Sequence, residues 1–349
     1  MADGKKDLDK APRSTSDNQI LSDGGGLVET ALVVHTAEVL CDMPQLESEA
    51  RRFADQAKSQ NTHRAYKADW ADFQRWCSAR SLDSLPAEPS TIAFYISDLS
   101  RTIKTSTIRR RLVAISQAHK AIGVVPPTQH LAVREVLKGI LREYGSATAQ
   151  KSSIGTADLR AMVAQTPDSL LGARDRALLL LGFAAALRRS ELVSLTVEDV
   201  TFVEEQGFVI RIRRSKTDPE GIGRDVAVPY GKRQETCAVL CLKGWLDQAK
   251  LRTGPLFRRL SSSGNVQAAP LSDRAVARIV QRYAAAIGLD VSRYAGHSLR
   301  SGFVTAAAAL GAAEHDIQQV TGHRSVQVLR QYIRRGSMFQ KCPLREMDL

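Results

Sequence analysis

The chain has 349 residues, of which 43% are hydrophobic, and this length suits two domains that each bury a core. The longest apolar run, residues 177–187, has 11 residues, whereas a membrane-spanning helix needs about 20, so we expect no membrane partner. The first residues lack the basic-then-apolar pattern of a secretory signal, which predicts a cytoplasmic, nucleoid-associated protein.

Positive charge is concentrated in one part of the chain. Residues 1–45 carry 4 basic and 8 acidic side chains, whereas the remaining residues carry 45 basic and 29 acidic ones. This excess favours a polyanionic partner, nucleic acid first. The five scattered cysteines do not suggest a disulfide framework. Cys237 and Cys241, four apart on an expected helix, are interpreted as core residues rather than metal ligands.

The first part of the chain is expected to be helical. Residues 1–45 are predicted to be a largely disordered tail, with a short helix of uncertain role within 27–43. From residue 46 onward apolar residues recur at helical spacing, as at Tyr66, Trp70, Phe73 and Cys77. This predicts an all-helical domain over 46–145, whose later helices cover 92–99, 108–121 with Thr107 as N-cap, and 131–144.

A second domain is predicted over residues 156–335, after a linker of small and polar residues at 146–155. Helices are expected at 156–165 and 172–187, and from Ser190. The only clear β signal is a hairpin formed by residues 208–212 and 225–228. The fold class is therefore mainly α with a small β hairpin or sheet in the second domain (α+β). Residues 336–349 form a C-terminal tail.

Several segments carry cationic, imidazole or phenol groups at expected helix or strand ends. Each has an ordinary interpretation by itself: a solvated helix start, a surface lysine, a turn or a core tyrosine. The residues concerned, in chain order, are Arg188, Lys216, His297, Arg300, His323 and Tyr332.

Together these residues follow the order Arg…Lys…His-x-x-Arg…His…Tyr, which resembles the pattern of the tyrosine recombinase (phage integrase) family. His323 lies 23 residues after Arg300 and Tyr332 a further 9, and the resemblance spans residues 46–340. It implies the tyrosine recombinase catalytic fold over 156–335, a helical SAM-like core-binding domain over 46–145, and a two-domain, C-shaped DNA clamp. It also implies a site-specific DNA recombinase that needs no metal, ATP or other cofactor.

The same resemblance implies a role for each residue. Arg188 and Arg300 would hold the scissile phosphate, because the planar guanidinium gives bidentate bonds to phosphate oxygens. Lys216 would protonate the leaving 5′ oxygen, His297 would help to take the tyrosine proton, and His323 would donate to the phosphate. Tyr332 would be the nucleophile that forms a 3′-phosphotyrosine on the way to a Holliday junction.

Three further residues near these positions have open interpretations. Glu191 is either a carboxylate that orients the catalytic groups or an ordinary helix-start glutamate. Arg189 stands where an aliphatic residue is common in the family. Tyr294, three residues before His297, is a rival nucleophile that we disfavour because the family pattern has no tyrosine there.

The DNA partner implied is a duplex with an inverted-repeat site, bound by a homotetramer. Arg109, Arg110 and Arg111 lie on the helix that enters the major groove in such proteins, and they read bases, contact phosphates or form a solvated basic face. Weaker candidates for phosphate contacts are Lys104, Arg64 and Lys67. Residues 336–349 are rich in apolar side chains, and the resemblance implies that this tail docks in trans on a neighbouring protomer rather than packing on its own domain.

Two alternative functions share parts of this pattern. A type IB topoisomerase-like nicking-closing enzyme would use the same chemistry, and a DNA-binding regulator would bind without catalysis. The helical first domain and short length favour recombination, and the intact residue set argues against a regulator.

Overall fold

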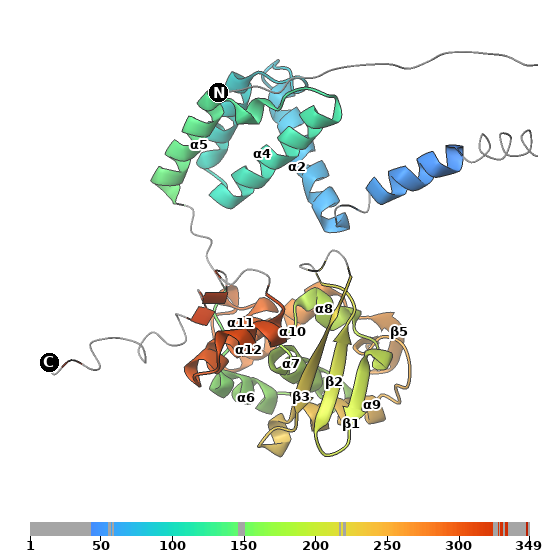
Figure 1. Cartoon of the computed structure of the whole chain (residues 1–349). Coiled ribbons are helices and arrows are strands. Elements are labelled where there is room, and N and C mark those ends of the chain that lie inside the picture. The colour runs from blue at the N-terminus through green and yellow to red at the C-terminus, as the bar shows by residue number, and fades with distance from the viewer. Residues whose placement is uncertain are drawn as a thin grey trace, which may run out of the picture. The chain divides into compact units, whose positions relative to one another are not determined.

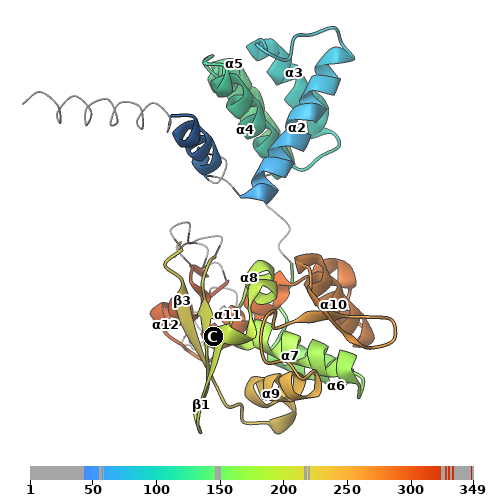
Figure 2. The same ribbon diagram turned by 90° about the vertical axis from the view of Figure 1, so that its right-hand side faces the viewer.

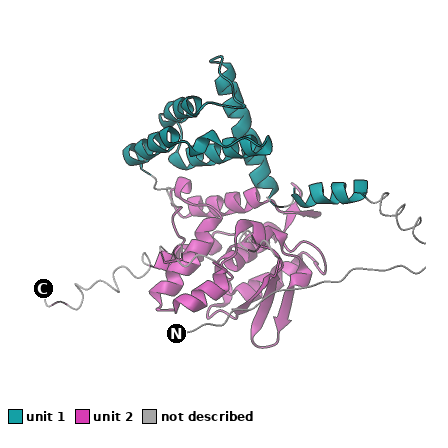
Figure 3. Ribbon diagram, turned by 45° about the horizontal axis from the view of Figure 1, so that its top comes forward, with its two compact units in different colours: residues 1–148 teal, residues 149–349 magenta. Residues whose placement is uncertain are grey.

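The computed structural model describes residues 43–54, 57, 59–145, 151–215, 218, 221–323, 327, 329–330, 332–333 and 347. The chain divides into two compact units, residues 1–148 and 149–349 (Figure 3). The tail expected before residue 43 and nearly all of the C-terminal tail lie outside the described residues, as does Lys216.

Unit 1 is helical, as its apolar spacing predicts. After a helix over residues 43–54, its elements are α2 (Gln60–Ser78), α3 (Pro89–Ser100), α4 (Thr105–Ala121), η1 (Pro127–Gln129) and α5 (Leu131–Tyr144) (Figure 1). Phe73 and Cys77 of the predicted stripe are buried between α2 and its neighbours, where they meet Ile92 and Ile108. The α5 helix has the predicted bounds.

The start of α4 differs from the prediction. The helix begins at Thr105, with Lys104 as its N-cap, so Thr107 lies within the first turn rather than capping it. The backbone of Lys104 is still extended (φ −65°, ψ 142°) and the helical hydrogen bonds begin directly after it. The prediction was wrong because it relied on a capping side chain, and no side-chain cap is made here.

Unit 2 combines helices with two small antiparallel sheets (Figures 1 and 2). Its helices are α6 (Thr156–Ala164), α7 (Leu170–Ala184), α8 (Arg189–Ser194), η2 (Val197–Asp199), η3 (Gln234–Thr236), α9 (Ala238–Gln248), α10 (Asp273–Ala286), η4 (Val291–Arg293), α11 (His297–Ala309) and α12 (Glu314–Thr321). The apolar helix α7 is buried in the middle of the core, where it packs against α9 and α11. The mainly α prediction with a small β element is confirmed.

The sheets are larger than the single predicted hairpin. That hairpin is β2 (Gly207–Ile212) and β3 (Arg224–Pro229), and β1 (Val200–Val203) adds a third strand beside β2. A second hairpin pairs β4 (Arg258–Leu260) with β5 (Val266–Pro270). The missed strands have only 4, 3 and 5 residues and no fully buried position, so they are too short for a pattern of apolar and polar residues to identify them.

The α7 helix ends earlier than predicted, and this ending positions the site. Ala186 adopts a left-handed backbone (φ 49°), so the chain leaves the helix after Ala184 although residues 177–187 are all apolar. Leu187 remains buried, and Arg188 becomes the N-cap of α8. A continuous apolar run therefore contains a sharp turn directly before the first candidate catalytic residue.

The second half of the predicted linker belongs to unit 2. The Ser152 N–H donates to the carbonyl oxygen of Arg293 (2.7 Å), and the Ile154 N–H donates to that of Ser298 (3.1 Å). The Ile154 side chain is fully buried. Gly302 of α11 permits this contact, because a Cβ atom there would lie 2.1 Å from the Ile154 carbonyl oxygen.

We therefore predict that Gly302→Ala lowers the free energy of unfolding by roughly 1–3 kcal/mol, the usual cost of overpacking. Gly244→Ala is the matched control, because Gly244 also lies within a helix of unit 2 and a Cβ there meets nothing within 4 Å. The control should stabilise by about 0.5–1 kcal/mol through helix propensity. Urea unfolding of the whole chain tests both. If the two substitutions changed the free energy of unfolding equally, the close contact between Gly302 and the Ile154 carbonyl oxygen would be contradicted.

Candidate active site

A buried carboxylate organises one side of the candidate site. Glu191 is 1% exposed and accepts a hydrogen bond from the backbone N–H of Arg188 (3.0 Å), which caps α8. Its Oε1 accepts from Nη1 of Arg188 (2.6 Å), and its Oε2 accepts from Nη2 of Arg224 (3.2 Å). Burial by itself raises the pKa of Glu191, but Arg224, the Arg188 N–H and the Arg188 guanidinium together lower it to about 2. The carboxylate is therefore ionised and shared by two arginines.

Ser215 ties the end of the hairpin to this carboxylate. Its hydroxyl donates to Oε1 of Glu191 and accepts from Nη1 of Arg188, each at 2.7 Å. Ser215 directly precedes Lys216, whose own placement lies outside the described residues. The start of the Lys216 loop is thus attached to the Arg188–Glu191 pair.

Arg300 is a buried cation with unsatisfied donors. It lies on the first turn of α11 and is 1% exposed. Its Nη1 donates to the carbonyl oxygen of Ala186 (2.7 Å), whereas its Nε and Nη2 have no hydrogen-bond partner among the described residues. Burial, followed by the charge of Arg188, lowers the pKa of Arg300 to about 9, so the group is still cationic at neutral pH. Buried N–H donors of this kind favour an anionic oxygen ligand.

His297 and Tyr332 form a hydrogen-bonded pair. Nε2 of His297 lies 3.1 Å from the Tyr332 hydroxyl, although the residues are 35 apart in sequence. Desolvation of the His297 ring, then the charges of Arg300, Arg188 and Arg189, lowers the pKa of this histidine, although part of the residue is exposed. A neutral imidazole is able to accept the phenol proton. The Tyr332 ring packs in a small apolar cluster with Val304, Ala308, Ile317 and Leu329.

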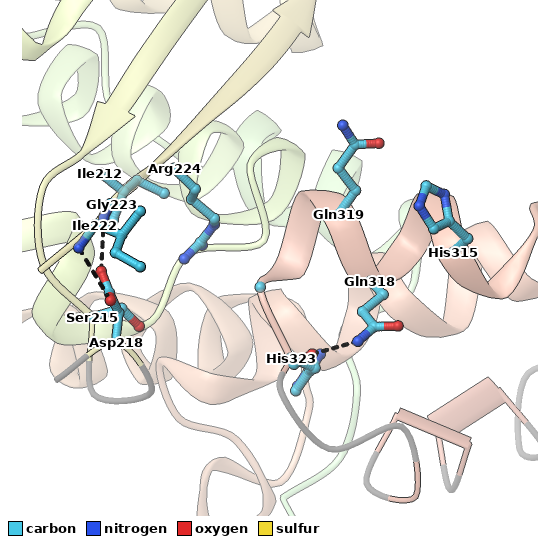
Figure 4. A pocket seen from close by; sticks show the side chains of 11 residues that line it. Ile212, Ser215, Asp218, Ile222, Gly223, Arg224, His315, Gln318, Gln319 and His323 are labelled. Atoms are coloured by element: carbon cyan, nitrogen blue, oxygen red, sulfur yellow. Dashed lines mark hydrogen bonds between the residues drawn. The ribbon is translucent and has the colours of Figure 1, made fainter. Parts of the chain in front are cut away.

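His323 lies at the end of α12 beside a cavity of about 620 Å³. Figure 4 shows that the cavity is lined by His323 and Gln318 on one side and by Arg224 and the hairpin loop on the other. Burial, then the charges of Arg300 and Arg188 and lesser effects of His297 and Arg224, lowers the pKa of His323 to about 3. The amide of Gln318 donates to the His323 carbonyl oxygen (2.8 Å), which fixes the turn.

The structure thus brings together most of the predicted residues. Arg188, Glu191, His297, Arg300, His323 and Tyr332 are joined by hydrogen bonds or act on each other's pKa. The rival Tyr294 is buried in the main hydrophobic core of unit 2 instead. Arg189 extends its aliphatic stem over Gly296, where a Cβ would meet its Cγ at 2.2 Å, and it reaches Asp273 at 4.0 Å.

Sequence reasoning missed Arg224 and Ser215. Arg224 starts β3, and its guanidinium lies against Gly322, where a Cβ would come within 2.8 Å of Nη1. The only sequence signals were their positions on either side of the Lys216 loop, and these do not distinguish them from exposed hairpin residues.

The arginine run of α4 is divided between structural and exposed side chains. Arg110 makes two hydrogen bonds to Asp69 (2.7 and 2.9 Å), and Arg111 bonds to Asp72 and to the Tyr95 hydroxyl (2.9 Å). Arg109 is exposed and has no partner among the described residues. The other predicted contacts, Lys104, Arg64 and Lys67, are also exposed, and Arg64 bonds to Asn61 (2.7 Å).

Within the described part of the chain, no helix is both long and apolar enough to span a bilayer.

Comparison with known proteins identifies the family to which the chain belongs. Residues 153–337 match the phage integrase family. An integrase/recombinase xerD homolog of Selenomonas ruminantium is 40% identical over 312 residues, which cover 87% of this chain and 90% of that protein. The recombinase cre of Escherichia phage P1 is 25% identical over 301 residues, covering 80% and 85% of the two chains.

A lambda integrase dimer bound to a COC′ core site has a similar fold, with a TM-score of 0.56 and 18% identity over 82% of this chain and 93% of that one. The family match covers more than half of the sequence, and the Selenomonas relative aligns along most of both chains. The chain therefore belongs to the phage integrase family and is a tyrosine site-specific recombinase.

Proposed function

We propose that this recombinase cleaves each DNA strand by attack of the Tyr332 hydroxyl on the scissile phosphate. The observation that carries the proposal is the 3.1 Å hydrogen bond between Tyr332 and Nε2 of His297, beside the buried guanidinium of Arg300. The new bond joins the tyrosine oxygen to phosphorus, and the bond from phosphorus to the 5′ oxygen breaks. The products are a 3′-phosphotyrosine and a free 5′-hydroxyl, so rejoining needs no ATP.

Charge and proton transfer are divided among the surrounding residues. Arg188 and Arg300 bind the non-bridging oxygens and offset the charge that develops on them. Glu191 holds the Arg188 fork in place, since it accepts from both the backbone and the side chain of that residue. The neutral His297 accepts the phenol proton, and Lys216 supplies a proton to the departing 5′ oxygen.

The rival functions are less well supported. A regulator that only binds DNA has no use for a tyrosine held against a neutral histidine. A topoisomerase-like enzyme would share the site, but the recombinase relatives align with both units of the chain.

Tyr332→Phe should bind DNA normally and form no covalent adduct, because only the attacking oxygen is lost. The assay uses nicked suicide duplexes that carry the site found by footprinting DNA beside the gene, with excess EDTA present throughout. Tyr294→Phe is the control and should form the adduct. An adduct with Tyr332→Phe, or none with the unaltered protein, would overturn the assignment.

Lys216→Ala should cleave slowly on ordinary DNA and recover on DNA with sulfur at the bridging 5′ position, because a thiolate leaves without a proton. Arg188→Ala should remain slow on both substrates, since it acts on the non-bridging oxygens. Single-turnover cleavage rates measure the recovery. Equal rates of Lys216→Ala on the two substrates would remove lysine from the role of general acid.

The DNA partner that we propose is a duplex with an inverted repeat, bound by a homotetramer that holds four sites together, with the two units closing on the duplex as a clamp. Strand exchange through a Holliday junction needs such an assembly. Residues 336–349 would link neighbouring protomers. An apolar cavity of about 490 Å³ in unit 2, lined in part by Leu159, Leu180, Phe183 and Phe303, supports this role by offering a place for apolar side chains.

Two arginines of α4 are predicted to differ: substitution of Arg109 should affect DNA binding, and substitution of Arg111 should affect the stability of the fold. Arg109→Ala should weaken DNA binding with little loss of stability. If Arg109 contacts phosphate, the salt slope should fall by about one, and if it reads a base, preference should relax at one position. Arg111→Ala should instead lower the free energy of unfolding by roughly 1–3 kcal/mol, because it removes charge-assisted hydrogen bonds from a largely buried guanidinium to Asp72 and to the Tyr95 hydroxyl. Binding titrations in several salt concentrations, with parallel unfolding curves, test the pair. Equal binding by Arg109→Ala and the unaltered protein would exclude it from the interface.

A further inference from the structure

The hydroxyl group of Thr321 lies between a backbone carbonyl and the ring of His323. Thr321 is the last residue of α12 and is fully buried. Its Oγ1 lies 2.7 Å from the carbonyl oxygen of Ile317 and 2.8 Å from Nδ1 of His323. Gly322 adopts a left-handed backbone (φ 62°), which turns the chain at the helix end between these two residues.

A threonine hydroxyl has one proton to donate, and this limits how the two contacts are made. Two oxygen atoms 2.7 Å apart need a proton between them, so the hydroxyl donates to Ile317. It then accepts at its second contact, and Nδ1 of His323 must be the donor. A neutral His323 therefore carries its proton on Nδ1 and has a lone pair on Nε2.

This tautomer is unsuited to binding phosphate. A phosphodiester offers only acceptors, and a lone pair on Nε2 would repel them. The charged and titratable groups that act on the ring are Arg300, Arg188, His297 and Arg224, and the cations among them, after burial, hold its pKa at about 3. The negative charge of a phosphate opposes this field and raises the pKa of the ring.

We propose that Thr321 is a positioning residue that holds His323 in the Nδ1–H tautomer, so that His323 donates to the scissile phosphate only after taking up a proton when DNA binds. This inference rests on the proposed role of His323 as a phosphate ligand. The ring then enters the complex as an imidazolium, which adds a positive charge to the site only when the phosphate is there.

The sign of the resulting pH dependence is fixed. The pKa of the ring is higher in the DNA complex than in the free protein, so between these two values binding takes up one proton. Over that interval, affinity falls by up to about tenfold for each unit rise in pH. Without the Thr321 hydroxyl, the neutral ring can carry its proton on Nε2 and donate to phosphate, and the dependence should weaken.

The tautomer is measured first, in the protein without DNA, by nitrogen NMR of labelled histidines, with the His323 signals assigned through their loss in His323→Asn. We expect a proton on Nδ1 in the unaltered protein and in Thr321→Ser, which keeps the hydroxyl. Thr321→Val has the same shape without the hydroxyl and should move the proton to Nε2. A proton on Nε2 in the unaltered protein would overturn the proposal even if the valine variant failed to fold.

Proton uptake is measured second, by calorimetry of half-site duplex binding in buffers of different ionisation enthalpy. The Tyr332→Phe background prevents cleavage. Adding Thr321→Val should remove close to one proton of uptake, whereas adding Thr321→Ser should remove none. Equal uptake in all three proteins would overturn the proposed link between the Thr321 hydroxyl and protonation of His323. Neither measurement needs catalysis, so failure of Tyr332 as the nucleophile would appear separately, as a missing adduct.

Discussion

The ionised carboxylate of Glu191 is the group on which the rest of the site depends. The guanidinium groups of Arg188, Arg224 and Arg300 act on one another in a poorly solvated region, where like charges repel strongly. Glu191 accepts from two of them and from the start of α8, so it both caps that helix and binds the arginines. The structure therefore contains the contacts that each of the two interpretations of this residue requires, the helix cap and the bonds to arginine.

One carboxylate does not neutralise three arginines, and the remaining positive charge has chemical consequences. Among the described residues Arg300 donates only to the carbonyl oxygen of Ala186, so its Nε and Nη2 are available to an anionic oxygen. Burial, together with the same field, lowers the pKa of both His297 and His323 and so favours their neutral forms. A cationic site with neutral imidazoles can attract an anion and still hold an uncharged ring beside the Tyr332 hydroxyl.

Unit 1 uses the same kind of pairing for a structural purpose. Asp69 is buried on α2 and fixes Arg110, while Asp72 and Tyr95 fix Arg111. These pairs join α4 to α2 across 41 and 39 residues of sequence, and α4 to α3 across 16. A run of three arginines therefore looks uniform in the sequence but has different surroundings at each position.

Helices with a clear apolar face were predictable from the sequence, because burial of one face imposes a spacing that can be read directly, as in α2 and α5. The candidate site residues were found in another way, through the resemblance of their order in the chain to a family pattern, and the structure brings Arg188, His297, Arg300, His323 and Tyr332 together. The sequence did not reveal two pairings between distant residues, Arg224 with Glu191 and Arg110 with Asp69. It also did not reveal the turn at Ala186 inside an apolar run. These depend on tertiary contacts that leave no local pattern. The contact of Thr321 with His323 is local, but a threonine at a helix end has many possible partners.

The segment around Ile154 gives the fold a mechanical property. It is the stretch by which the chain enters unit 2, and it is hydrogen-bonded to Ser298, the residue next to His297 and two before Arg300. Its buried side chain and the contact at Gly302 anchor it along the same helix. Tension on the chain where it enters unit 2 is therefore borne first by the bond of Ser152 to Arg293, and then by the bond of Ile154 to Ser298 of α11, the helix that carries His297 and Arg300. Strain on this segment and the placement of His297 and Arg300 are thus linked by a path of a few residues.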